Sequence, residues 1–172
     1  RQAIFTLKGK PPNVWDLKRD AIYKNDEIYN LMRALNIEDS VDNLRYSKVI
    51  LATDADVDGM HIRNLLITFF FRFFDEVVRR GHLHILETPL FRVRNKKVTH
   101  YCYSEDERQN ALSSLGRGAE VTRFKGLGEI SPHEFRPFIG PEMRITSVDY
   151  ALKTEASPIL NFYMGQIRKS TV

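Results

Sequence analysis

One apolar run, Lys-Val-Ile-Leu-Ala-Thr at residues 48–53, restricts the folds open to this chain more than any other feature. Its β-branched and apolar residues form an unbroken series, which is typical of a strand buried on both faces of a sheet. Residues 60–80 then place apolar side chains at helical spacing, and Gly81 is a good C-terminal stop for that helix. The pattern predicts an α/β fold with a mostly parallel sheet, in which residues 48–53 form a central strand.

Strand and helix patterns alternate along the rest of the chain. The 172 residues are 42% hydrophobic and 28% charged, so a packed core is expected. Strands are also predicted at 3–9, 82–87 and 120–124, and a hairpin is predicted at 90–103. Helices are predicted at 14–35, with a break at the N-cap Asn25, and from Ser104 to about Leu115. A further helix is predicted after the capping box that begins at Ser131.

Composition argues against some classes of protein. The apolar run at residues 65–74 is interrupted by Arg72 and is too short to span a bilayer, and no signal peptide is present, so no membrane partner is expected. Cys102 is the only cysteine, which excludes an internal disulfide and fits a reducing compartment. The net charge of +4 permits an anionic partner without requiring one. A chain that begins Arg-Gln-Ala-Ile-Phe is expected to be part of a longer protein.

Three carboxylates, Asp54, Asp56 and Asp58, stand at alternate positions after the predicted strand and are followed by Gly59. A calcium loop of the helix–loop–helix type needs such oxygens, a glycine at the sixth position and a glutamate at the twelfth. The twelfth position is Leu65, and a strand enters the loop, so calcium is disfavoured. Carboxylates at the end of a parallel strand suit a magnesium ion that keeps waters and shares a substrate phosphate. The alternative is a solvated acidic turn that caps the next helix.

Four motifs, in order along the chain, resemble those of one family. Residues 50–74, with their Asp-Ala-Asp-Val-Asp-Gly segment, resemble the Toprim domain in the B subunit of bacterial type IIA topoisomerases. Residues 7–14 resemble the basic loop that precedes this segment. Residues 123–129 resemble the Lys-Gly-Leu-Gly-Glu motif that opens the C-terminal tail of these proteins, and residues 159–165 resemble a segment close to their end.

The resemblance implies a Rossmann-like Toprim domain, with a mostly parallel sheet flanked by helices, at residues 1–118, and a small, mainly helical C-terminal tail element at 119–172. The domain is expected to be N-terminally truncated, because the family's Glu-Gly-Asp-Ser motif is absent from the sequence. Some gyrases carry a long insertion before the Lys-Gly-Leu-Gly-Glu motif, and only a short stretch precedes it here. This compact arrangement and the residue pattern at 88–97 resemble topoisomerase IV more than DNA gyrase.

The resemblance also assigns roles to the acidic residues. In the family the first two aspartates bind the divalent metals, so Asp54 and Asp56 are the expected catalytic metal ligands. Asp58 is expected to support the cluster or to bind through water. Mg²⁺ is the implied cofactor, and Mn²⁺ or Ca²⁺ can substitute for it in binding. The family's glutamate ligand belongs to the absent motif, so this fragment alone is expected to be inactive.

The basic loop at residues 7–14 and a residue after the acidic segment supply candidate DNA contacts. Lys10 and Asn13 match positions that contact DNA, and Lys8 lies beside them. His61 follows the acidic loop and can reach a phosphate. The structural alternatives are a solvated lysine side chain and a histidine that only closes the first turn of its helix.

The implied function is cleavage and religation of double-stranded DNA during ATP-dependent strand passage, in a heterotetramer with an A subunit that carries the nucleophilic tyrosine. ATP would bind only in the family's N-terminal ATPase domain, which this sequence lacks. None of the seven tyrosines stands in a nucleophile's context, and Tyr101 and Tyr103 alternate on a strand, a packing pattern. The expected location is the cytoplasm, on the bacterial nucleoid. The alternatives are another Toprim magnesium phosphotransferase, such as a primase or an OLD-type nuclease, and a non-catalytic DNA-binding module.

Overall fold

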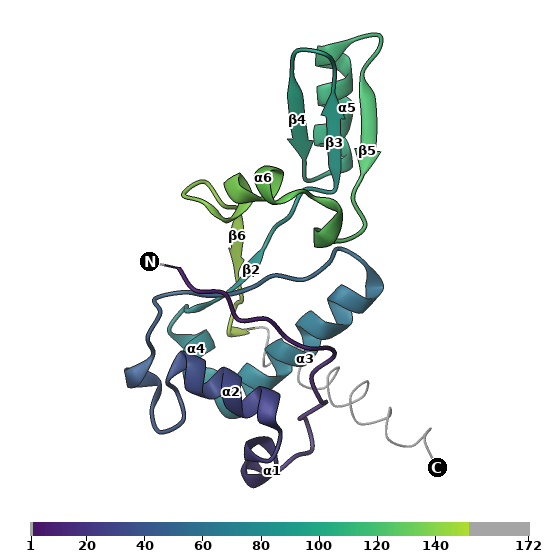
Figure 1. Cartoon of the computed structure of the whole chain (residues 1–172). Helices are drawn as coiled ribbons and strands as arrows, with labels where there is room; N and C mark the ends of the chain where they lie inside the picture. Colours follow the sequence, from purple (N-terminus) through teal and green to yellow (C-terminus); the bar gives the residue numbers. More distant parts are fainter. Residues whose placement is uncertain (1, 152–172) are drawn as a thin grey trace, which may run out of the picture. The chain divides into compact units, whose positions relative to one another are not determined.

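The computed structural model describes residues 2–151, drawn in colour in Figure 1. These residues form two compact units. The first unit takes the described parts of Arg1–Leu51, His61–His84 and Ser147–Val172, and the second takes Ala52–Met60 and Ile85–Thr146. The family-like segment at 159–165 lies outside the described residues.

The first unit opens with two short helices, α1 (Arg19–Tyr23) and α2 (Asp26–Leu35). The predicted break between them is confirmed, because the side chain of Asn25 accepts a hydrogen bond from the backbone N–H of Ile28 at 3.0 Å. This is the N-cap geometry that asparagine favours. The buried face of α2 carries Ile28, Leu31, Met32 and Leu35, which places the helix against the core of this unit.

The helix predicted at 60–80 is divided into α3 (Val57–Phe73) and α4 (Asp75–Arg79). The division falls at Phe74, whose backbone leaves the helical region at φ −140° and whose side chain is buried. The ring centroids of Phe69 and Phe74 lie 5.4 Å apart, so burial of the aromatic ring accompanies the break. Gly81 follows with φ 72°, a left-handed conformation that glycine adopts without strain, and the predicted stop is confirmed.

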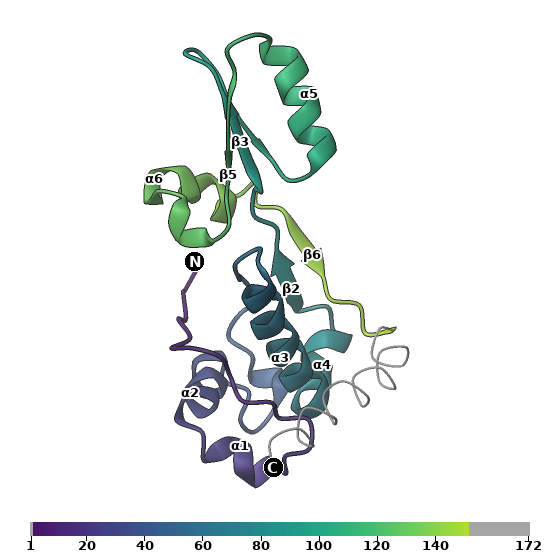
Figure 2. The same cartoon turned by 90° about the vertical axis from the view of Figure 1, so that its right-hand side faces the viewer.

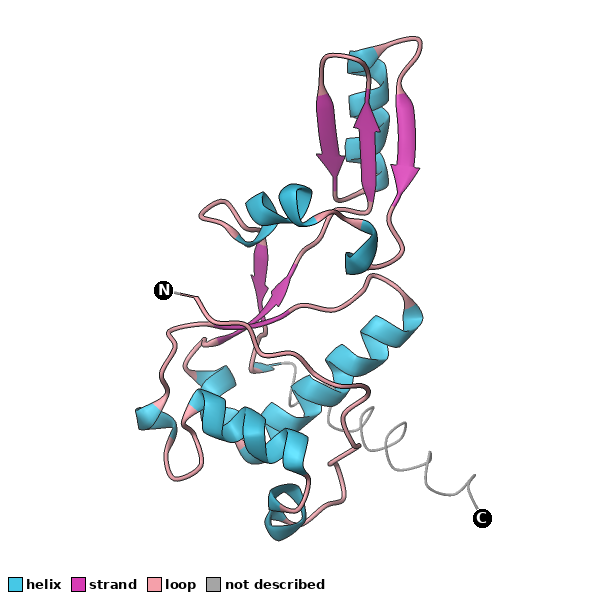
Figure 3. Cartoon of the chain, viewed as in Figure 1, coloured by secondary structure: helices cyan, strands magenta, loops and turns pink. Residues whose placement is uncertain are grey.

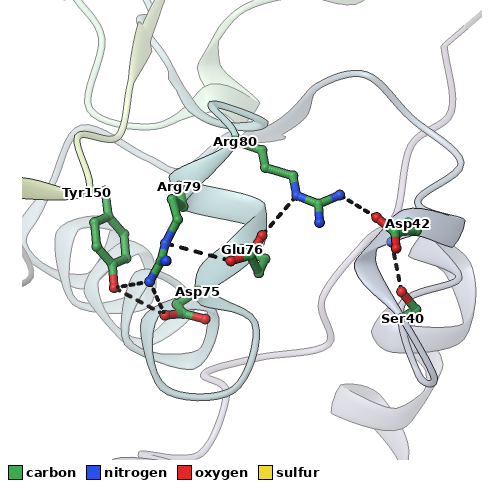
Figure 4. Close-up of polar contacts among 7 residues, drawn as sticks. All are labelled: Ser40, Asp42, Asp75, Glu76, Arg79, Arg80 and Tyr150. Atoms are coloured by element: carbon green, nitrogen blue, oxygen red, sulfur yellow. Dashed lines mark hydrogen bonds and ion pairs between the residues drawn. The ribbon is translucent and has the colours of Figure 1, made fainter.

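A polar network covers part of the surface of the first unit (Figure 4) and is formed by Ser40, Asp42, Asp75, Glu76, Arg79, Arg80 and Tyr150. Arg80, the residue after α4, pairs with Glu76 of that helix and with Asp42 of the 3₁₀ turn at Val41–Asn43. The hydrogen bond and charge of Arg80 lower the pKa of Asp42. The hydroxyl of Tyr150 donates to Asp75 at 3.1 Å, and Arg79 donates to that hydroxyl at 2.9 Å. Exposed pairs of this kind add little to stability.

Three strands form one sheet with the order β1-β2-β6: β1 (Val49–Leu51), β2 (Leu83–Leu86) and β6 (Ile145–Ser147). The strands predicted at 48–53 and 82–87 are confirmed, and β6 was not predicted. The central position predicted for residues 48–53 is wrong, because β1 stands at the end of the described order. Burial depends on the side chains packed over a strand's faces and not on its hydrogen-bonded neighbours, so an apolar run does not separate central from terminal strands.

The strand predicted at residues 3–9 is also absent from the described structure, where this segment has no regular element. Ile4 is 82% exposed and Phe5 is 42% exposed. A strand needs a partner for its backbone groups, and β-branched or aromatic composition does not supply one.

The second unit contains an antiparallel sheet with the order β4-β3-β5, made of β3 (Phe91–Arg94), β4 (Thr99–Cys102) and β5 (Glu120–Arg123). Figure 3 shows the three strands side by side, and Figure 2 shows α5 (Glu105–Leu115) along one face of this sheet. The predicted hairpin is confirmed. The antiparallel pairing of β3 with both β4 and β5 departs from the predicted mostly parallel sheet. The link from β3 to β4 is too short for the crossover that a parallel pair needs.

Two small hydrophobic clusters hold the second unit together. Val93, Cys102 and Ala111 are buried between the sheet and α5. A second cluster of Phe124, Ile130 and Phe138 lies beside α6 (Pro132–Phe135) and the 3₁₀ turn at Arg136–Ile139. The predicted helix cap at Ser104 and the capping box at Ser131 are both confirmed. Within residues 2–151, no helix has the length and apolar character needed to cross a membrane.

Candidate functional site

The acidic loop connects β1 to α3, as the sequence predicts. Asp54, Asp56 and Asp58 lie in this loop and at the start of the helix, and all three are exposed. Asp56 directly precedes α3, and its Oδ1 accepts a hydrogen bond from the backbone N–H of Gly59 at 2.7 Å. This is the contact that an N-cap residue makes with the third helical position. Helix capping therefore accounts for one aspartate, whereas Asp58 lies in the first turn of α3, where the helix dipole favours a negative charge.

Gly59 lets the loop close on itself. A Cβ atom at this position would lie only 2.0 Å from the backbone carbonyl oxygen of Asp54. The backbone N–H of Met60 also donates to the carbonyl oxygen of Asp56 at 3.0 Å. Gly59 is thus required by the close approach of two backbone segments. This requirement explains why a glycine stands at the position that matches the sixth position of a calcium loop.

Asp54 receives a contact that the sequence did not reveal. Its Oδ1 accepts a hydrogen bond from the backbone N–H of Leu127 at 2.7 Å. Gly126 lies directly against the same carboxylate, since a Cβ there would meet the Asp54 carboxylate carbon and both its oxygens at 3.2 Å. Both residues belong to the Lys-Gly-Leu-Gly-Glu motif, so the second unit brings this motif and the first aspartate together.

The Lys-Gly-Leu-Gly-Glu motif forms a compact turn. The backbone N–H of Lys125 donates to the carboxylate of Glu129 at 2.9 Å, and a 3₁₀ turn occupies Leu127–Glu129. Ile130 follows and is buried in the cluster with Phe124. The turn is therefore anchored at both ends, and its Leu127 N–H is presented to Asp54.

Whether these residues fit a divalent cation depends on their donor atoms. Within residues 2–151, no three His, Cys, Asp or Glu side chains come together as a metal-binding group. The carboxylates of Asp54 and Asp56 are hard oxygen donors, and each uses Oδ1 for a backbone hydrogen bond. Each carboxylate also has a second oxygen, a hard donor of the kind that divalent cations take. By its chemistry this donor set suits a magnesium ion that keeps most of its ligands as waters.

The basic loop belongs to the first unit. Lys8 and Lys10 are exposed, and the backbone N–H of Lys8 donates to the carboxylate of Glu27. The side-chain oxygen of Asn13 accepts from the backbone N–H of Trp15 at 3.1 Å, which closes a local turn. A structural role thus accounts for the oxygen of Asn13, while both lysines are accessible to solvent.

His61 and the tyrosines can be placed as well. His61 is exposed on α3. The rings of Tyr101 and Tyr103 both contact Phe138, with centroids 4.9 Å and 6.3 Å away, as the predicted packing pattern requires. Burial raises the pKa of Tyr101 to about 12, with a further contribution from its hydrogen bond to Glu134. Such a phenol is a poor nucleophile at neutral pH.

Comparisons with known proteins agree with this arrangement. The Toprim domain family matches residues 1–88. The B subunit of DNA topoisomerase 4 from Borreliella burgdorferi is 60% identical over 96% of the chain, and the B subunit of DNA gyrase from Thermus thermophilus is 39% identical over 96%. The chain spans 28% of the length of each of these relatives.

A solved structure is similar in fold. It is the DNA-binding, cleavage and re-ligation domain of topoisomerase II from Plasmodium falciparum, which aligns with a TM-score of 0.66 and 28% identity. The alignment covers 77% of this chain and 19% of that one. The expected preference for topoisomerase IV over gyrase agrees with the higher identity to the former. The chain belongs to the Toprim domain family.

Proposed function

We propose that the chain is the metal-binding part of a type IIA DNA topoisomerase. In the complete complex it would support magnesium-dependent cleavage and religation of double-stranded DNA by a tyrosine of the partner A subunit, during ATP-dependent strand passage in the cytoplasm. One observation carries the proposal: Asp54 and Asp56 lie in a loop directly after β1, in a chain that matches the Toprim family.

The acidic residues would hold the cation. Asp54 and Asp56 would supply carboxylate oxygens, and Asp58 would support them through water or through its charge. The bound ion would supply positive charge next to the scissile phosphate and the leaving oxygen. The backbone N–H of Leu127 keeps one oxygen of Asp54 engaged at 2.7 Å, so the carboxylate has a defined orientation before any ion binds.

Other residues of the chain would hold the DNA backbone. Lys8 and Lys10 are exposed and positively charged, which suits contacts to phosphates on either side of the cleaved bond. Asn13 and His61 would add hydrogen bonds. A Toprim domain ending near residue 118, with a tail after it, remains the proposed functional division.

The nucleophile is proposed to come from outside the chain. Tyr101 has a raised pKa and a packing role, which supports a tyrosine from the A subunit. The chain alone is proposed to be inactive, because the sequence lacks the family's Glu-Gly-Asp-Ser motif. A non-catalytic DNA-binding module is the second candidate, and it is favoured by the lack of a group of three metal ligands within residues 2–151.

The test uses the complete protein paired with its A subunit and one labelled duplex. Asp54→Asn or Asp56→Asn should lower trapped covalent complex on the order of a thousandfold, because charge on the phosphate loses its counter-ion. DNA binding should survive, since removing a negative charge does not weaken attraction to phosphate. Asp106→Asn, which removes an exposed charge elsewhere, is the matched control.

The basic loop is tested on the same duplex across a salt series. Lys10→Ala should weaken binding about equally for all sequences and reduce the salt slope by about 1. Lys97→Ala, another exposed lysine, is the matched control. If the aspartate variants lose binding but keep cleavage per bound complex, the metal assignment is wrong.

A further inference from the structure

Glu134 lies in α6, shortly after the Lys-Gly-Leu-Gly-Glu turn in the sequence, and is the centre of a polar network. Its Oε1 accepts hydrogen bonds from the guanidinium of Arg92 on β3 and from the hydroxyl of Tyr101 on β4, the latter at 2.8 Å. Its Oε2 accepts from the hydroxyl of Ser131 at 2.9 Å and from the Ser131 backbone N–H at 3.4 Å. One carboxylate therefore joins two strands of the antiparallel sheet to the N-terminus of α6.

This network is more protected from solvent than the Arg94–Glu120 ion pair of the same sheet. The side chains of Arg92 and Glu134 are 19% and 25% exposed, whereas those of Arg94 and Glu120 are 48% and 71% exposed. The hydrogen bond from Arg92, followed by those from Tyr101 and Ser131, lowers the pKa of Glu134 to about 2. The carboxylate is therefore charged at every pH at which the fold is expected to work.

The network borders both ends of the turn that touches Asp54. On one side, the guanidinium of Arg92 lies over the ring of Phe124, 5.7 Å from its centroid. On the other side, Ser131 directly follows Ile130, which is buried with Phe124 and Phe138. The turn at residues 125–129 therefore lies between two contacts of the network. Arg92 packs on Phe124 before the turn, and Glu134 bonds Ser131 after it.

We propose that Glu134 is a positioning residue for Asp54. By tying α6 to the sheet, it fixes the turn so that the Leu127 N–H and Gly126 hold the Asp54 carboxylate in one orientation. The inference rests on the proposed function for its meaning, since a metal ligand gains affinity when surrounding hydrogen bonds orient it. Glu134 does not touch the reacting atoms, and its effect passes through Leu127.

A capping box alone would give Glu134 a purely local role at the start of α6. The experiment must therefore measure how firmly the turn that contains Leu127 is held. Amide hydrogen exchange of Leu127 in the ¹⁵N-labelled chain is measured relative to that of Val93, a buried residue on β3, the central strand of the antiparallel sheet. Mg²⁺ titrations then follow the resonances of Asp54 and Leu127. Glu134→Gln keeps the shape of the side chain, and Glu120→Gln is the matched control, because it removes the exposed pair with Arg94.

Glu134→Gln should accelerate Leu127 exchange relative to Val93 by about tenfold, the size expected when a charge-assisted hydrogen bond is lost. The Mg²⁺ concentration at half-saturation should rise on the order of tenfold. Glu120→Gln should change neither. Tyr101→Phe, which removes one donor and leaves the charge pair, should shift Leu127 exchange in the same direction by less, and it keeps the inference testable if Glu134→Gln does not fold.

Unchanged Leu127 exchange in both Glu134→Gln and Tyr101→Phe would overturn the positioning role, and so would an equal effect of Glu120→Gln. The two proposals fail separately. A wild-type chain whose Asp54 resonance does not respond to Mg²⁺ contradicts the metal-binding function, while the exchange of Leu127 alone decides whether Glu134 positions the turn.

Discussion

Replacing Gly59 by alanine is expected to destabilise the acidic loop, because backbone atoms occupy the space that the new methyl group needs. The added Cβ would lie 2.0 Å from the carbonyl oxygen of Asp54 and 2.7 Å from the carbonyl carbon. The two backbone segments must therefore separate by about 1 Å or more to reach ordinary contact. Overpacking and the weakened hydrogen bond to Asp56 together should cost about 3 kcal/mol of unfolding free energy.

Two other glycines provide a graded series on the same loop and turn. Gly126→Ala places a Cβ 3.2 Å from the Asp54 carboxylate, a contact that a small side-chain shift can relieve. Its cost should be about 1 kcal/mol, partly offset by the lower entropy of the unfolded chain. Gly128→Ala meets no atom within 4 Å and should change stability by less than about 0.5 kcal/mol.

Thermal unfolding of the three variants measures the series. A loss of about 3 kcal/mol should lower the Tm of Gly59→Ala by about 6–12 °C for a chain of this size, while Gly128→Ala stays close to wild type. Exchange of the Leu127 amide should be faster in Gly126→Ala than in Gly128→Ala. Equal Tm values for Gly59→Ala and Gly128→Ala would refute the reasoning, since they would show that the loop does not close through this contact.

Two further predictions concern capping and pH. Asn25→Ala and Ser104→Ala should each lower the unfolding free energy by about 1 kcal/mol in urea denaturation. Each substitution removes the acceptor for a backbone N–H at a helix N-terminus. Ser114→Ala, at an exposed position of α5, is the control and should have almost no effect. The pKa of Glu134 lies at about 2, below the ordinary value of about 4.3 for an unfolded glutamate, so its stabilising contribution is complete above about pH 5 and is lost as the pH falls toward 2. Glu134→Gln should therefore flatten the pH dependence of stability between about pH 5 and 2, and equal slopes for the wild type and this variant would contradict the assignment.

Local signals carried much of the fold prediction. The caps at Asn25, Ser104 and Ser131 were predicted because a capping side chain lies within a few residues of the N–H that it binds. The hairpin of β3 and β4 was predicted for the same reason. The break at Phe74 was missed, because no glycine or proline marks it and the burial of the ring that accompanies it is a tertiary feature.

The sequence predicted the part of the candidate site that consists of acidic side chains, and it did not predict the contacts that hold them. Asp54, Asp56 and Asp58 are recognisable from their spacing and from the strand before them. The contact from Leu127 to Asp54 joins residues 73 positions apart, and its donor is a backbone N–H that almost every residue has. Arg92 and Glu134 pair across 42 positions, and neither has a neighbour in sequence that predicts the partner. Such contacts depend on the folded chain and not on any local pattern.

The sequence has one tryptophan and one cysteine, and they fall in different units of the fold. Trp15 is half-buried in the first unit, where its carbonyl oxygen accepts a hydrogen bond from Arg72 at 3.2 Å. Cys102 is buried beneath α5 in the second unit. Indole fluorescence and thiol alkylation in urea are thus two native reporters that need no engineered label. Coincident transitions would show that both units unfold as one cooperative block, and separated transitions would give the stability of each.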